Sequence, residues 1–320
     1  MSSEHDRDRD ISPLPAPPKP KSYLLTSCTT PFGHLLTTTL LGLGASVAAC
    51  CTRSEFSSPL VSALRDTPTS GGLVILELDA LSAATCQSAL ANAVRAFGRV
   101  DAVVHTGVSS FVGALEEMGD TDIKRQFEEG YFGRVNVVKA ALTVMRKQRG
   151  GHIVVVTGLT GAMGTPGLSL RCASDHAIEG LLDALAYEVA PFGVRVSVVQ
   201  PGVEAAVWGQ GGVFVAQPGA AYDEVEAVAR VRKLAGMGMR VEEEEVRDAV
   251  KIVVEIAGSE NPPGRITVGE EQVDLVKERL KTISEELEEY LEASLGADIN
   301  APPGQGGTGG RTRPVTGEEQ

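Results

Sequence analysis

The chain has 320 residues, of which 42% are apolar and only 4% aromatic, and its net charge is −13. This apolar content is sufficient to bury a full core, which must be mainly aliphatic. An acidic surface repels phosphate backbones and anionic lipid, so the composition argues against nucleic acid or a membrane surface as partner.

The cysteines and the first residues favour a cytoplasmic protein. The five cysteines show no CxxC spacing, and Cys50 and Cys51 are adjacent in an apolar run, which suits reduced, buried thiols and predicts no metal site. The opening MSSEHDRDRD lacks the apolar region of a signal peptide. No apolar stretch reaches the roughly 18 residues of a membrane-spanning helix.

Six short apolar runs are predicted as strands. They are rich in Val, Ile and Leu without polar alternation, which is typical of strands buried on both faces of a parallel sheet. The runs are Tyr23–Thr26, Ser46–Cys51, Leu73–Leu78, Ala102–His105, Ile153–Val156 and Val194–Val199.

Helical periodicity separates these strands. Apolar residues recur every three or four positions after Asp120, a candidate N-cap, and again after Ser174. Strand–helix alternation predicts an α/β fold with a doubly wound parallel sheet. We expect a single domain over residues 22–269, with residues 1–21 and 297–320 disordered.

A different pattern covers residues 270–296. Val273, Val276, Leu280 and Leu287 keep helical spacing among Glu and Lys residues. The pattern predicts an amphipathic helix, too short for an independent coiled coil. We expect it to pack on the domain, with a dimer or partner contact as the alternative.

Several motifs resemble those of short-chain dehydrogenases/reductases. The segment from Thr26 to Gly33 is similar to the family's glycine-rich TGxxxGxG loop, and Asp79 stands where the family has an acid that contacts adenine. Residues 113–117, the pair Pro201-Gly202 and residues 262–269 follow in register; the last resembles members that act on hydroxysteroids and retinoids. The resemblance implies a Rossmann-like fold, a nicotinamide cofactor, and Phe32, Gly33 and Asp79 as cofactor-binding positions.

The four catalytic positions of that family are all changed. Gly130 replaces the Asn, Gly158 the Ser, Arg171 the Tyr and Asp175 the Lys. A guanidinium with a pKa above about 12 cannot exchange a proton near neutral pH. Arg171 and Asp175, four residues apart on a helix, should form an ion pair that fills the vacated pocket, worth about 0.2–0.5 kcal/mol if exposed.

The cofactor loop is altered too. Ser27 and Pro31 replace glycines that let backbone N–H groups approach a pyrophosphate, and Pro31 has no N–H. Arg53, after the second strand, could meet a 2′-phosphate, and Cys51 stands where an NAD-selective acid would be. NADP is therefore the cofactor that the sequence favours, with weak or absent binding expected.

Three functions remain open. The loss of all four catalytic residues favours a non-catalytic binding, regulatory or partner subunit. One alternative is a divergent NADP-dependent oxidoreductase of lipophilic alcohols and ketones. The other is a non-redox isomerase or cyclase that uses Asp175 or His105. A histidine at the end of a buried strand, such as His105, is more often a core residue with satisfied hydrogen bonds than a catalytic base. The family resemblance also implies a homodimer, or a heterodimer with another member, through residues 120–147 and 170–191.

Overall fold

The computed structural model describes residues 21–69, 71–236 and 243–291. Nearly all of the termini predicted to be disordered, residues 1–21 and 297–320, therefore lie outside the described residues. The chain divides into two units, Met1–Val276 and Lys277–Gln320, and each is considered by itself.

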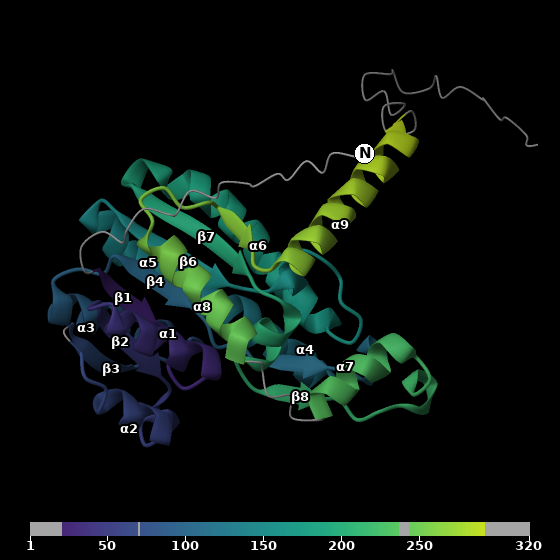
Figure 1. Cartoon of the computed structure of the whole chain (residues 1–320), viewed down its shortest axis with the longest axis horizontal. Coiled ribbons are helices and arrows are strands. Elements are labelled where there is room, and N and C mark those ends of the chain that lie inside the picture. Colours follow the sequence, from purple (N-terminus) through teal and green to yellow (C-terminus); the bar gives the residue numbers. More distant parts are fainter. Residues whose placement is uncertain (1–20, 70, 237–242, 292–320) are drawn as a thin grey trace, which may run out of the picture. The chain divides into compact units, whose positions relative to one another are not determined.

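A parallel seven-stranded sheet forms the centre of the first unit (Figure 1). Its strand order is β3-β2-β1-β4-β6-β7-β9, and every neighbouring pair is parallel. The predicted doubly wound sheet is confirmed. The chain reverses its direction of winding between β1 and β4, and a ligand crevice opens at such a point in sheets of this kind.

Nine strands lie in the described residues, and they include all six predicted runs. A short edge strand, β9, and the small parallel pair of β5 and β8 were not predicted. The bounds are β1 Ser22–Leu25, β2 Ser46–Cys51, β3 Leu73–Glu77, β4 Ala102–His105, β5 Ser110–Val112, β6 Gly151–Val156, β7 Val194–Gln200, β8 Val213–Val215 and β9 Arg265–Thr267.

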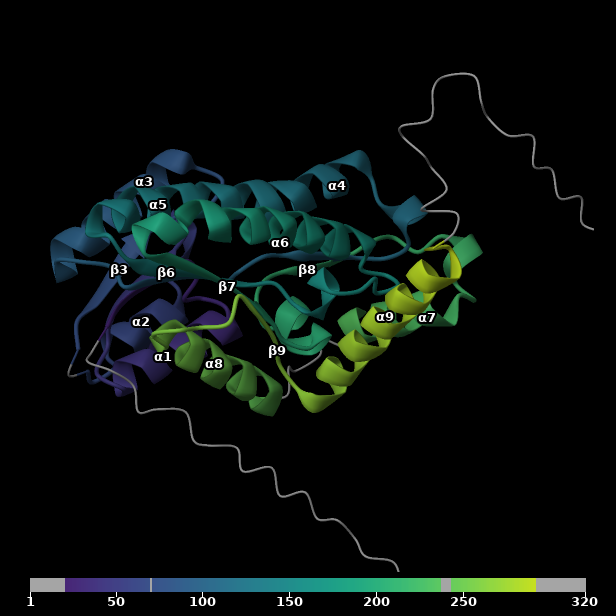
Figure 2. The same cartoon turned by 90° about the horizontal axis from the view of Figure 1, so that it is seen from above.

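Helices cover both faces of the sheet (Figure 2). Helices α1 and α8 lie on one face, and α3, α5 and α6 lie on the other. The α-helices are α1 Pro31–Gly42, α2 Pro59–Arg65, α3 Ala83–Phe97, α4 Asp120–Phe127, α5 Arg134–Gln148, α6 Ser169–Val189, α7 Glu226–Gly236, α8 Glu243–Gly258 and α9 Glu270–Glu289.

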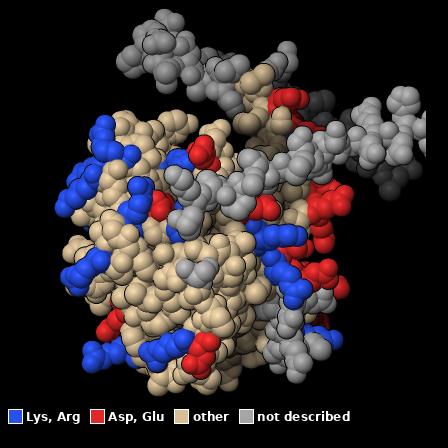
Figure 3. All heavy atoms as spheres, turned by 60° about the vertical axis from the view of Figure 1, so that its left-hand side comes forward, with Lys and Arg blue, Asp and Glu red and all other residues tan. Residues whose placement is uncertain are grey.

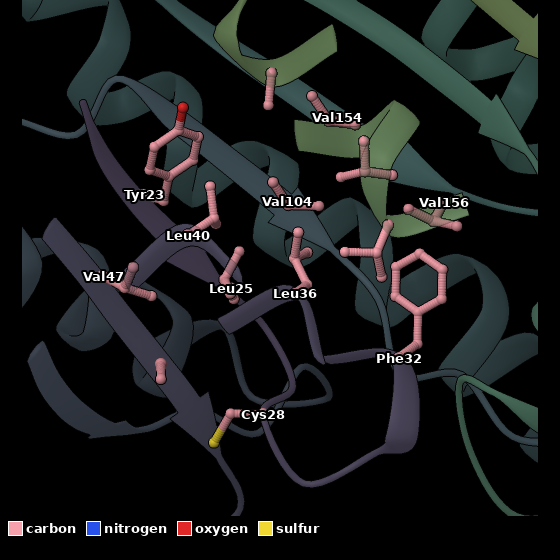
Figure 4. Packing of buried hydrophobic residues seen from close by; sticks show 14 of the residues in the cluster. Tyr23, Leu25, Cys28, Phe32, Leu36, Leu40, Val47, Val104, Val154 and Val156 are labelled. Carbon is pink, nitrogen blue, oxygen red and sulfur yellow. The ribbon is translucent and has the colours of Figure 1, made fainter. Parts of the chain in front are cut away.

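Two aliphatic cores hold the layers together. The first packs Leu36 and Leu40 of α1 and Val250 of α8 against the sheet. Figure 4 shows part of it, with Leu36 and Leu40 among the valines of the strands. The second core packs Leu90 of α3 and Ile178 of α6 on the opposite face. Because both faces are covered, the strands need apolar residues at every position, as the sequence has.

The long helix predicted after Asp120 is interrupted. Between α4 and α5 the chain makes a π-helical segment, Glu128–Gly133. The predicted cap is off by one residue: Gly119 is the N-cap, and its N–H donates to the Asp122 carboxylate at 3.0 Å. The π-helical segment matters for the site because it contains Gly130, one of the four changed catalytic positions.

The second unit contributes the later part of α9 to the described residues. Leu280 and Leu287 on this helix are exposed, as are Tyr290 and Leu291 just after it. The amphipathic helix predicted over residues 270–296 is present up to Glu289. Its packing on the domain stays a prediction.

The face drawn in Figure 3 carries charges of both signs. On the face drawn in Figure 3, Lys and Arg side chains stand apart among uncharged residues and form no continuous patch. Within the described ranges, no helix is both long and apolar enough to cross a membrane.

Candidate functional site

A cavity of about 590 Å³ opens at the carboxyl ends of strands β1 to β4. Each of these strands contributes to the lining at its carboxyl end: Ser27 follows β1, Cys51 ends β2, Asp79 follows β3 and His105 ends β4. This is the crevice at the switch point of the sheet, where a ligand of such folds binds. Its volume is in the range of small-molecule sites.

Two predicted cofactor-binding residues belong to the scaffold. Phe32 is fully buried in the first core and points towards Val156 in Figure 4. At Gly33 a Cβ atom would lie 2.0 Å from the Ser27 carbonyl oxygen, so only glycine allows α1 to pack this closely on the loop. Neither residue lines the cavity.

The amino end of α1 is saturated by the chain itself. The Phe32 N–H donates to the Gly209 carbonyl oxygen at 3.0 Å, and the Gly33 N–H donates to the Thr30 hydroxyl at 3.1 Å. The His34 N–H donates to the Thr30 carbonyl oxygen, and Pro31 has no N–H. Helix N-terminal N–H groups bind phosphate only when they are available. This arrangement does not fit the pyrophosphate of a dinucleotide.

The charges around the cavity are mostly negative. Its lining holds three carboxylates, Glu55, Asp79 and Glu129, and one guanidinium, Arg125. Arg125 pairs with Glu129 at 2.9 Å. Glu55 accepts hydrogen bonds from the Thr29 and Thr52 hydroxyls, both at 2.6 Å. The guanidinium of the lining, Arg125, is thus already paired with a carboxylate through Nε, and its side chain is 47% exposed.

Arg53 and Asp79, the other two predicted cofactor-binding residues, lie in different surroundings. The Arg53 side chain is 87% exposed, 3.7 Å from Glu77, and is not part of the cavity lining. Asp79 does line the cavity, and its carboxylate accepts a hydrogen bond from the Leu81 N–H at 2.9 Å. Asp79 is thus the one of the four that faces the crevice.

A buried charge cluster occupies the positions that the family resemblance assigns to catalysis. Asp175 receives Arg134 Nη1 on one carboxylate oxygen at 2.5 Å, and Arg171 Nε at 2.8 Å and the Thr160 hydroxyl at 2.7 Å on the other. All three charged side chains are 0% exposed. The predicted Arg171–Asp175 pair is present, but it is completely buried, so the value for an exposed pair does not apply.

The guanidiniums also bind the backbone around them. Arg171 donates to the Val108 and Thr157 carbonyl oxygens, both at 3.0 Å, and Arg134 donates to the Val156 carbonyl oxygen at 3.3 Å. These carbonyls lie at or beyond the ends of β4 and β6. The cluster therefore ties α5 and α6 to the strand ends and fills the space between them.

The electrostatics keep this cluster charged and its neighbour neutral. Burial raises the pKa of Asp175, but the guanidiniums of Arg171 and Arg134 and the Thr160 hydroxyl outweigh it, so this pKa lies below its usual range. Burial and the same two cations lower the pKa of His105 to about 3. Neither group is suited to exchange a proton near neutral pH. His105 is buried as expected; it lies at the cavity wall, and its ring nitrogens have no side-chain hydrogen-bond partner within the described residues.

Packing has closed around both glycines of the catalytic set. At Gly130 a Cβ atom would lie 2.6 Å from the Ser174 hydroxyl, and at Gly158 it would lie 2.5 Å from the Ala206 Cβ. Gly158 also has φ +147°, a conformation that favours glycine. Side chains at these two positions are therefore excluded by the surrounding packing as well as missing from the sequence.

One segment after β7 accounts for most of this closure. Residues 204–212 place Ala206 against Gly158 and the Gly209 carbonyl on α1. Val207 and Trp208 join a small apolar core with Leu168 and Cys172, next to the charge cluster. The same segment thus occupies the amino end of α1, the serine position and the adjoining apolar space.

A second buried acid supports the strand ends behind the cluster. Glu179 accepts hydrogen bonds from the Thr157 hydroxyl at 2.6 Å and from the Gln200 amide at 2.9 Å, and burial raises its pKa. At Gly161 a Cβ atom would lie 1.9 Å from its carboxylate. A side chain at Gly161 would therefore displace this carboxylate from its hydrogen bonds.

The sequence did not identify Arg134, Thr160 or the Gly209 carbonyl as parts of this site. Arg134 falls on the predicted long helix, where the spacing of charged residues gives no sign that its side chain is buried. Asp175 itself could have indicated a further cation. An acid buried at the position where the family has a Lys needs compensating positive charge. The register between α5 and α6 that supplies this cation cannot be read from one sequence.

Comparison with known proteins places these observations in a family. The profile of the family described as short chain dehydrogenase matches residues 21–208. Oxidoreductase BOA17 of Botryotinia fuckeliana is 32% identical over 203 residues, which cover 63% of this chain and 73% of that protein.

Solved structures agree with this match. A short-chain dehydrogenase from Streptomyces avermitilis is 28% identical with a TM-score of 0.74, over 88% of this chain and all of that one. A short chain dehydrogenase/reductase from Burkholderia phymatum in complex with NAD has a TM-score of 0.68 over 83% of this chain and 95% of that chain. At 20% identity, this second likeness concerns the fold alone.

Proposed function

The chain belongs to the short chain dehydrogenase family, and we propose that it has given up hydride-transfer chemistry and acts as a binding protein, as a regulatory or partner subunit. One observation carries this proposal: the Arg134–Asp175–Arg171 cluster fills the catalytic centre with fully buried charges.

The chemistry of the cluster supports the proposal. Reduction of a carbonyl needs a proton donor at the developing alkoxide, and such a donor typically contributes about 10²–10⁴-fold. The guanidinium of Arg171 does not release its proton, and Asp175 stays ionised beside two cations. Both side chains are also out of reach of a substrate, since neither is exposed.

The cavity at the ends of β1 to β4 is the part of the site that we propose to keep a binding role. Its polar lining and volume suit a small molecule. The saturated amino end of α1 and the acidic lining argue against a dinucleotide, so we expect NADP to bind weakly or not at all. We further propose a cytoplasmic location.

Two measurements on the purified protein test this function. Isothermal titration calorimetry with NADPH, NADP, NADH and NAD should give no binding, or binding far weaker than that of an active family member titrated in parallel. An assay with NADPH and a panel of lipophilic ketones should show no turnover. Turnover comparable to that of the active member would refute the proposal and favour the divergent oxidoreductase.

We also propose that the protein associates through α4, α5 and α6, either with itself or with another family member. The elements in this region carry exposed aromatic side chains: Phe132, in the π-helical segment, is 57% exposed, and Tyr187 on α6 is 85% exposed. Light scattering at micromolar concentration should give a dimer mass, and Tyr187→Ser should shift it towards the monomer. The association would be contradicted if the wild-type protein is a monomer and also forms no complex with an active family member when the two are mixed.

A further inference from the structure

Two of the five cysteines meet at the wall of the cavity. Cys28 follows β1 and Cys51 ends β2, and both belong to the core layer on the α1 face, whereas Cys50 belongs to the opposite layer. The Cys28 N–H donates to the Cys50 carbonyl oxygen at 2.8 Å, so Cys28 lies beside the Cys50–Cys51 peptide. Figure 4 shows the Cys28 sulfur near the end of β2.

The two thiols influence each other's ionisation. Interaction with Cys51 raises the pKa of Cys28, and interaction with Cys28 lowers the pKa of Cys51. Disulfides join residues whose Cα atoms lie about 4.4–6.8 Å apart, and neighbouring strands are about 4.8 Å apart. The hydrogen bond from the Cys28 N–H to the Cys50 carbonyl oxygen puts Cys28 beside the end of β2, so we expect Cys28 and Cys51 to be within reach of a disulfide.

Contact with the cavity distinguishes Cys51 from the other cysteines, all of which are buried and lie in the described part of the chain; Cys51 itself is 2% exposed. Cys51 lines the cavity, and Cys28, Cys50, Cys86 and Cys172 do not. Burial raises the pKa of Cys86 to about 11, and it also raises the pKa of Cys50 and Cys172. A small oxidant that enters the cavity thus meets the Cys51 thiol, whose pKa is lowered, with Cys28 beside the same strand end.

We propose that Cys51 and Cys28 form an oxidisable dithiol in the wall of the cavity, with a low-molecular-weight peroxide as the oxidant. The Cys51 thiolate attacks the peroxide; the O–O bond breaks, an S–O bond forms, and the other oxygen leaves as water or an alcohol after taking up a proton. The Cys28 thiol then attacks the Cys51 sulfenic acid; the S–O bond breaks, the S–S bond forms, and the hydroxyl leaves with the thiol proton as water. Sulfur is oxidised and peroxide is reduced. The product ties the loop before α1 to the end of β2.

The test is a peptide map of the full-length protein. Reduced protein is treated with a few equivalents of hydrogen peroxide, blocked with N-ethylmaleimide and digested without reductant. We expect a Cys28–Cys51 linked peptide, lighter by two hydrogen atoms than the two thiol peptides, that disappears with dithiothreitol. The other cysteines should carry the maleimide only after denaturation.

Three variants assign the roles. Cys28→Ser should leave a Cys51 sulfenic acid that dimedone traps, Cys51→Ser should abolish oxidation of Cys28, and Cys50→Ser should leave the yield of the linked peptide unchanged. The proposal is overturned if native wild type shows no linked peptide under conditions that oxidise glutathione completely. It is equally overturned if the link forms only in urea, because the pair would then be inaccessible in the fold.

Discussion

The two ends of the crevice have diverged in opposite ways. At the end formed by β1, β2 and β3, polar side chains such as Asp79 and Thr52 surround an open cavity. At the end formed by β4, β6 and α6, polar side chains of larger size, Arg134 and Arg171, are buried without any exposed surface. One fold thus keeps an open site at one end and closes it at the other.

The difference shows what closing a catalytic centre requires. Removing functional groups leaves a hole, and a buried hole costs free energy. Here the guanidiniums fill the volume, and Asp175 supplies a compensating charge with Thr160 as a further donor. The segment after β7 then packs over Gly158 through Ala206, and Ser174 of α6 packs over Gly130. The residues that fill the closed end therefore depend on one another, so a single substitution should disrupt their packing.

The largest expected effect comes from neutralising the acid of the cluster. Asp175→Asn leaves two buried guanidiniums uncompensated, and breaking a buried pair in this way costs about 3–5 kcal/mol. Urea unfolding should show this loss of stability. The matched control is Asp183→Asn on the same helix, whose carboxylate is 62% exposed in its pair with Arg265 and should contribute less than about 1 kcal/mol. Equal losses in the two variants would contradict the role of the cluster.

Restoring the family serine should fail for steric reasons. Gly158→Ser places a Cβ atom against Ala206 and forces a side chain onto a backbone with φ +147°, which should cost about 1–3 kcal/mol. Gly164→Ser, where a Cβ atom would meet nothing, is the control. Ala206→Gly should recover part of the loss in the double variant. If Gly158→Ser is as stable as wild type, the packing described for the closed end is incorrect.

The free energy of unfolding should fall on acidification because of His105, which lies between the open and the closed end of the crevice. The pKa of His105 is about 3 in the folded chain and near 6.5 when unfolded, so below pH 6.5 the unfolded state binds a proton that the folded state does not. This difference removes about 2 kcal/mol between pH 7 and pH 5. His152, also with a folded pKa of about 3, acts in the same direction. In His105→Gln the loss between these two pH values, measured by urea unfolding, should be smaller by about that amount; an unchanged pH dependence would contradict a buried, neutral His105.

The smallest effect is expected at the open end. Arg53→Ala removes an exposed side chain with one partner at 3.7 Å, and stability should change by less than about 0.5 kcal/mol. NADP titration of the same variant sharpens the comparison. A measurable wild-type affinity for NADP that drops in Arg53→Ala, but not in Arg65→Ala, would assign Arg53 a 2′-phosphate contact and would reopen the cofactor question.

The sequence by itself determined the fold, whereas the loss of redox chemistry stays a prediction. Continuous aliphatic runs alternate with helical periodicity because a parallel sheet must be covered on both faces, and this pattern is local. The replaced residues at positions 130, 158, 171 and 175 could be read in register for the same reason, since motif order along the chain follows the order of the strands.

Only the tertiary structure decided what took their place. Arg134 joins Asp175 across 41 positions, and the Gly209 carbonyl reaches α1 across 177, so neither contact leaves a local pattern in the sequence. The π-helical turn that carries Gly130 and the burial of the Arg171–Asp175 pair depend equally on how helices and loops pack at the strand ends. Local periodicity encodes which elements form, whereas the filling of a buried space depends on side chains that meet only after those elements have packed.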